Sequence, residues 1–92
     1  MNIFDDDDYL VTSPAENFFN IARMANRDIV NHEMEKLFDR LATLEILLED
    51  KELGATFASM LKTLPFSDPE RFEDAKNSLF IETVGAIVSQ QE

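Results

Sequence analysis

The apolar residues between Asp28 and Leu53 recur at alternating steps of four and three, which is the most constraining pattern in this sequence. They are Val30, Met34, Leu37, Leu41, Leu44 and Leu48. This spacing places all six side chains on one stripe of an α-helix, whereas a strand would send alternate side chains to opposite faces. The stripe is widened by Phe38, Ile46 and Leu47. A helix with so wide an apolar surface must be covered on more than one side, which predicts a helical bundle.

A second helix signal precedes this stripe at Ser13, Pro14 and Glu16. A Ser cap, Pro at the first helical position and Glu three residues after the cap form a capping box, so we expect a helix to begin at Pro14. Its predicted buried face has four–three–four spacing and consists of Phe18, Ala22, Ala25 and Ile29. Its end stays open between two alternatives. Either residues 26–28 break the chain into two helices, or one helix continues to Leu53, because no Pro or Gly interrupts it.

Glycine and proline mark the remaining helix ends. Gly54 is placed to close the preceding helix in a left-handed conformation, and Pro65 is placed to end a short helix after it. Asp68 and Pro69 repeat the cap and first-position arrangement, so a last helix should begin at Pro69. Its predicted buried residues are Phe72, Leu79, Phe80, Val84, Ile87 and Val88. By propensity alone a strand is the alternative for residues 79–88, but the chain offers it no convincing partner strand.

These signals together predict an all-α fold, a small bundle of about four helices near residues 14–27, 28–53, 55–64 and 69–89. Residues 13–92 then form one domain, and residues 1–12 precede it as an acidic N-terminal arm. The arm contains four consecutive aspartates, Asp5, Asp6, Asp7 and Asp8. Their mutual repulsion favours an extended, solvated chain. The apolar residues that flank them, such as Tyr9, Leu10 and Val11, offer the arm a way to attach to the bundle or to a partner.

The net charge of the chain restricts the classes of partner that it can bind. The formal net charge is −11, from 19 acidic and eight basic residues. Nucleic acids and anionic membranes would be repelled, because such binding draws on cationic contacts with phosphates and headgroups. A basic protein surface would be attracted. No apolar run approaches the ~20 residues of a membrane span, and neither Cys nor an export signal is present. We therefore expect a cytoplasmic protein that binds neither nucleic acid nor membrane directly.

The residue types that catalysis requires are scarce. His32 is the only histidine, and it has neither the second histidine of a zinc helix nor a serine-triad pattern around it. With only Gly54 and Gly85, the chain holds no phosphate-binding loop or dinucleotide fingerprint. The run of aspartates lacks the ordered ligands of a calcium loop. We expect no enzyme activity, no cofactor and no metal site.

Apolar residues outside the main stripes exceed what so small a bundle can cover, and exposed apolar patches mark interfaces. This surplus predicts a non-enzymatic protein-interaction module that self-associates as a homo-oligomer or docks on a partner protein. The candidate interface residues are Phe19, Ile46, Leu47, Phe66 and Ile81.

The acidic residues support an alternative function. Spaced carboxylates can imitate a phosphate backbone, as in a phage-type acidic inhibitor that blocks a basic, nucleic-acid-binding surface of a host protein. Besides the four aspartates of the arm, the candidate acidic surface consists of Glu35, Asp39, Glu45, Glu49, Glu52, Glu70, Glu73 and Asp74.

Overall fold

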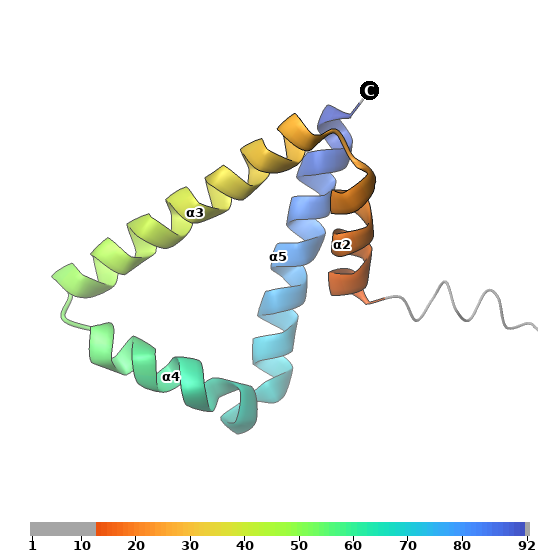
Figure 1. The fold of residues 1–92 in the computed structure, drawn as a ribbon. Coiled ribbons are helices and arrows are strands. Elements are labelled where there is room, and N and C mark those ends of the chain that lie inside the picture. Colours follow the sequence, from red (N-terminus) through yellow and green to blue (C-terminus); the bar gives the residue numbers. More distant parts are fainter. Residues whose placement is uncertain (1–12, 92) are drawn as a thin grey trace, which may run out of the picture.

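A computed structural model describes residues 13–91, which form four helices and no strand (Figure 1). The helices are α2 (Pro14–Met24), α3 (Arg27–Asp50), α4 (Gly54–Ser67) and α5 (Pro69–Gln90). The predicted all-α fold with about four helices is therefore confirmed. The predicted acidic arm, residues 1–12, lies outside the described residues.

The beginning of α2 follows the predicted capping box. The Glu16 N–H donates to Ser13 Oγ at 3.0 Å, and the Ser13 N–H donates in return to Glu16 Oε1 at 3.1 Å. Two otherwise unsatisfied N–H groups of the first turn are thereby paired.

The chain breaks between α2 and α3, which decides the open alternative in favour of two helices. Ala25 is extended, with φ −78° and ψ 166°, and Asn26 begins the next helix. The Asp28 N–H donates to Asn26 Oδ1 at 2.8 Å, so Asn26 caps α3. The first helix consequently ends at Met24 and not at the predicted residue 27.

The predicted role of Gly54 as a left-handed cap is wrong. Gly54 is the first residue of α4, and the left-handed residue of this turn is Glu52, with φ 57°. The turn is closed by the Leu53 N–H, which donates to the Leu48 carbonyl at 2.7 Å. The α3 helix therefore ends at Asp50, before the predicted end at residue 53.

The predicted end of the third helix at Pro65 is also wrong. Pro65 lies inside α4, which continues to Ser67. Pro65 has no N–H to donate to the Leu61 carbonyl, so α4 continues past it with one backbone hydrogen bond fewer. The helix ends when the Asp68 N–H donates to the Leu64 carbonyl at 3.0 Å. Asp68 then caps α5 by accepting from the Arg71 N–H at 3.4 Å, as its sequence predicts.

Residues 79–88 lie within α5 and are helical, so the strand alternative is excluded. Its β-branched residues follow a helix start set by Asp68 and Pro69, and no strand of the described residues is present to pair with them. A lone strand would leave its backbone groups without partners.

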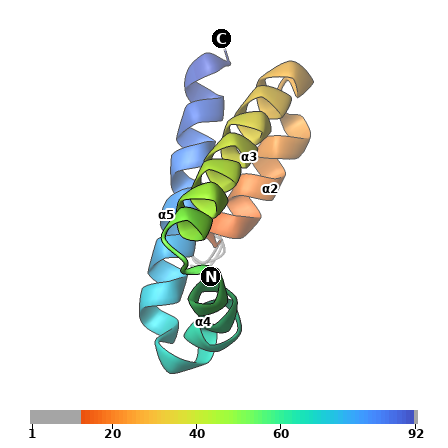
Figure 2. The same ribbon diagram turned by 90° about the vertical axis from the view of Figure 1, so that its left-hand side faces the viewer.

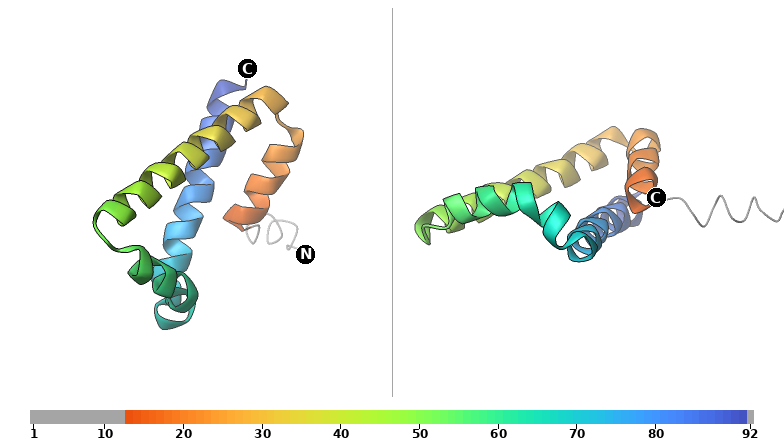
Figure 3. Two further views of the ribbon diagram at one scale, coloured as in Figure 1. Left: turned by 60° about the vertical axis from the view of Figure 1, so that its left-hand side comes forward. Right: turned by 90° about the horizontal axis from the view of Figure 1, so that it is seen from below.

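The helices form an open, flat frame. α3 diverges from α5 along its length, and α4 returns the chain to the base of α5 (Figure 1). Figure 2 shows α3 crossing in front of α2 and α5, and Figure 3 shows α3 and α4 extending away from α5 on the side opposite α2. The principal extents are 52 × 34 × 15 Å. The frame is therefore thin in one direction and broad in the other two.

The buried core is confined to one corner, where α2, α5 and the beginning of α3 meet. Its members are Phe18, Ala25, Val30 and Ile87. The ring of Phe18 lies 5.4 Å from that of Phe80 in α5, measured between centroids. Half-buried residues surround this corner, and they are Ile21, Ala22, Ile29, Met34, Phe80 and Val84. The predicted buried face of the first helix is therefore largely correct.

Outside this corner several residues that were predicted to be buried are exposed. Leu41 and Leu44, in the middle of the α3 stripe, are 52% and 51% exposed. Leu79 and Val88 of α5 are exposed as well. The stripe was expected to be covered on more than one side, yet a single chain of this shape does not cover it, because α4 and α5 diverge from α3 instead of packing along it.

Candidate protein-interaction surface

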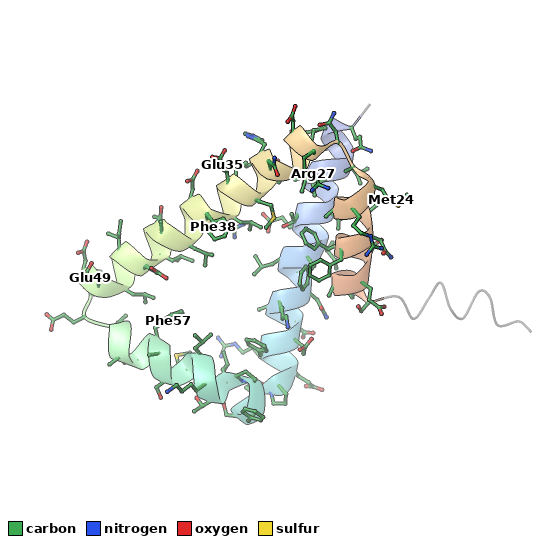
Figure 4. All side chains as sticks on the ribbon, in the orientation of Figure 1. Met24, Arg27, Glu35, Phe38, Glu49 and Phe57 are labelled. Carbon is green, nitrogen blue, oxygen red and sulfur yellow. The ribbon has the colours of Figure 1, made fainter. Side chains whose placement is uncertain are left out.

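The exposed part of the α3 stripe and the apolar side of α4 form the main candidate surface, which we call the apolar edge. It consists of the exposed residues Phe38, Leu41, Leu44, Phe57, Met60 and Leu61 and of the half-buried Leu48. The α3 members recur at helical spacing, and so do those of α4, so each set lies on one side of its helix. Phe38 and Phe57 lie on the sides of their helices that face the inside of the frame (Figure 4). The apolar edge therefore follows two helices of the frame.

An open pocket of about 550 Å³ continues the apolar edge at the junction of α3 and α4. Its lining consists of Ala42, Glu45, Ile46, Leu48, Glu49, Gly54 and Phe57. Leu48 and Phe57 belong to both the pocket and the edge. Two carboxylates beside apolar walls suit a side chain with an apolar stem and a basic head, because such a side chain buries the stem and keeps its charge paired.

The five interface residues predicted from the sequence are all exposed, but the structure does not bring them together. Ile46 and Leu47 flank the apolar edge on α3, and Ile46 lines the pocket. Phe66, 85% exposed, lies near the end of α4, half a turn away from the face that holds Phe57. Phe19 is in α2 and Ile81 is in α5. The sequence did not single out Phe38, Leu41 or Leu44 as surface residues, because their periodic spacing is that of a core stripe.

The predicted acidic residues are divided between two regions. Glu35, Asp39, Glu45 and Glu49 belong to α3, and Glu45 and Glu49 line the pocket at its junction with α4. Glu52 is in the turn after α3. The second region is the beginning of α5, with Glu70, Glu73 and Asp74. The arm aspartates lie outside the described residues. Within residues 13–91 the carboxylates thus occupy separate parts of the frame.

A family model described as a domain of unknown function, DUF2018, matches residues 10–92. The chain belongs to the DUF2018 family. Neither the comparison with curated proteins nor that with solved structures gives a match. The description of DUF2018 names no activity.

The DUF2018 chain also contains a buried carboxylate that its sequence does not reveal. Glu33 in α3 is 5% exposed, and its Oε2 accepts from Gln90 Nε2 of α5 and from Lys36 Nζ at 3.4 Å. Nearby, the Asn26 N–H donates to Gln91 Oε1 at 2.9 Å. These bonds join the beginning of α3 to the end of α5. No sequence motif signals this pairing, because its partners are far apart in the chain.

We expect Gln90→Ala to destabilise this corner by about 1–2 kcal/mol, because Glu33 would keep its buried position and lose a donor. Urea unfolding followed by circular dichroism measures the change. Ser89→Ala is the matched control, since the Ser89 hydroxyl is exposed and bonds only within its own helix, to the Ala86 carbonyl. Equal unfolding free energies for the two variants would contradict a stabilising role for the Gln90–Glu33 bond.

Two basic residues of α3 are paired with carboxylates, one within the helix and one in α5. Lys36 Nζ lies 3.4 Å from Glu33 Oε2, and Arg40 lies 3.5 Å from Glu82 of α5. These exposed bases are therefore partly neutralised, and each such pair contributes little stability.

Residues 13–91 were also inspected for the marks of a metal site, a catalytic histidine and a membrane-spanning helix. Between residues 13 and 91, no three His, Asp or Glu side chains are grouped so that they could hold a metal ion. His32 is exposed on α3. None of the four described helices has the length and apolar character needed to cross a membrane.

Proposed function

We propose that this DUF2018 protein is a non-enzymatic interaction module that self-associates, with the apolar edge of one copy packed against a second copy. The observation that supports the proposal is the exposure of the apolar edge along two helices. Water contact with so much clustered apolar surface is unfavourable, and monomeric proteins rarely expose patches larger than a few hundred Å².

The size of the apolar edge suits a stable interface. Six of its residues are 43% to 64% exposed, and Leu48 is half-buried. If each of the six offers about 200 Å² when fully exposed, a value typical of aromatic side chains and somewhat high for Leu, the set presents about 600 Å². A standard interface takes about 800 Å² from each partner. Association through this surface would therefore be of standard size, and its apolar character resembles that of homodimers.

The charges beside the apolar edge also suit a second copy. Arg40 lies on one flank of the α3 stripe and Glu45 on the other. When two copies of α3 lie side by side and parallel, Arg40 of one copy comes near Glu45 of the other, because residues on opposite flanks of an apolar stripe face each other across such an interface. A two-fold dimer uses the same surface twice, so one set of apolar residues suffices for both sides.

The solution mass tests this proposal directly. Light scattering on the purified protein, at low salt and at about 0.5 M salt, should give twice the 10.5 kDa mass of the chain in both buffers. Salt should have little effect, because apolar contacts carry the interface and exposed charges are screened within ~10 Å.

A monomer in both buffers would contradict self-association. The same result would favour the alternative proposal, an acidic inhibitor of a basic surface on a host protein. That function predicts competition with DNA or RNA for the target, and it predicts that salt weakens the competition. Under either proposal the partner is a protein, and a cytoplasmic location stays a prediction.

A further inference from the structure

The sulfur of this chain is confined to methionine. The sequence contains four Met residues and no Cys, so a peroxide finds only thioether sulfur to oxidise. Met1 lies outside the described residues. Met34 is half-buried against the core corner, whereas Met24 is 81% exposed and Met60 is 47% exposed. The consequence of each oxidation therefore depends on where the residue lies.

Met60 belongs to the apolar edge. Phe57, Met60 and Leu61 have the spacing of residues on one side of a helix, and all three are exposed in a single chain. In the proposed dimer the second copy covers this side of α4. The Met60 thioether then passes from water into an apolar interface, where every side chain of the edge is Phe, Leu or Met.

Oxidation would change Met60 from an apolar side chain to a polar one. The thioether sulfur gives up two electrons and bonds to one oxygen atom of hydrogen peroxide, the O–O bond breaks, and water is released. In the monomer, water donates hydrogen bonds to the new sulfoxide oxygen. The side chains of the apolar edge offer it no such donor, and a buried polar group without a hydrogen bond is unfavourable. Oxidation therefore favours the monomer.

We propose that Met60 is an oxidation site that regulates self-association: a peroxide converts its thioether to the sulfoxide in the monomer, and the sulfoxide weakens association through the apolar edge. This inference rests on the proposed self-association. The coupling is reciprocal, because a second copy that covers Met60 also protects it from the oxidant. Met24 stands outside this coupling, since it lies on α2, on the far side of α5 from α4 (Figure 4).

Peroxide treatment followed by light scattering over a dilution series tests the proposal. Peptide mass spectrometry gives the oxidised fraction of each methionine. We expect each buried sulfoxide to weaken the dimer about tenfold, so two oxidised copies should have a dissociation constant raised about 100-fold. Reduction by the two methionine sulfoxide reductases, one for each sulfoxide epimer, should restore the original constant.

Met60→Leu separates this site from the other methionines. Leu keeps the position apolar and similar in volume, so the variant should still dimerise, and it has no sulfur to oxidise. Its dissociation constant should be the same before and after peroxide. Met24→Leu should respond to peroxide as the unsubstituted protein does. Unfolding through oxidation of Met34 would appear as lost helix content in circular dichroism, and it would affect Met60→Leu equally.

Protection by the second copy gives an independent readout in the unsubstituted protein. Met60 should be oxidised more slowly at protein concentrations above the dissociation constant than below it. Met24 should be oxidised at the same rate at both concentrations, because no covered surface includes it. Equal rates for Met60 at the two concentrations would overturn the proposal.

Two results of the association measurement would overturn it as well. One is an unchanged dissociation constant in chains that are fully oxidised at Met60, and the other is an equal effect of peroxide on Met60→Leu. In both cases the untreated protein still dimerises, so the proposed function is unaffected. A monomeric untreated protein would refute self-association itself, and this inference with it, before any oxidant is added.

Discussion

Under the proposed self-association, Leu41→Asp is expected to convert the dimer to a monomer. Leu41 lies at the centre of the α3 stripe and is 52% exposed in a single chain, so in the proposed dimer the second copy supplies its burial. Losing one buried Leu side chain costs about 2 kcal/mol, and a two-fold dimer loses it twice. The resulting change of about 4 kcal/mol raises the dissociation constant about 1,000-fold, before the cost of a buried carboxylate is added. Light scattering over a dilution series measures this shift.

The matched control is Thr43→Asp. Thr43 is two residues from Leu41, on the opposite side of α3, and it is exposed. The added charge is the same in both variants, so only the position differs. A dimer that survives Leu41→Asp would exclude the apolar edge as the interface, whereas a dimer lost in both variants would point to general repulsion between acidic chains.

Ile87→Ala is expected to destabilise the fold by about 3 kcal/mol, because large-to-small changes at fully buried sites lose transfer energy and leave a cavity. Ile87 is 0% exposed and belongs to the one buried corner of the described chain. Small domains are stable by only about 5–15 kcal/mol, so this loss is a large fraction of the total. Urea unfolding at a fixed high protein concentration measures it, since association adds to the apparent stability.

Ile81→Ala is the control for this experiment, since it makes the same chemical change in the same helix. Ile81 is 61% exposed, so we expect a change below about 0.5 kcal/mol. Similar losses at Ile81 and Ile87 would mean that Ile81 is buried too, and would make the free face of α5 part of an interface.

The local signals of the sequence predicted most of the fold. The capping box at Ser13 and the cap at Asp68 act through hydrogen bonds within one turn, so they are readable from neighbouring residues alone. The two wrongly predicted helix ends are at Gly54 and Pro65. Each of these residue types can end a helix, but neither forces a helix to end. Glu52 supplies the left-handed conformation that Gly54 was expected to adopt.

The candidate surface was harder to predict than the helices. Periodic spacing identifies an apolar stripe but is the same for a buried stripe and an exposed one, so Leu41 and Leu44 were assigned to the core. Phe19 and Ile46, which lie off the main stripes, are exposed, and their part in an interface stays a prediction. The Glu33–Gln90 bond joins residues 57 positions apart, and no local pattern could reveal it.

The sequence alone determined the all-α class, the starts of α2 and α5 and the negative charge of the chain. These properties depend on spacing, capping and composition, which are local or additive. Only the tertiary structure decided which stripes are buried, because that depends on how far the helices diverge after each turn. The break at Ala25 and the turn at residues 51–53 set those directions. They leave one corner packed and the apolar edge of α3 and α4 open.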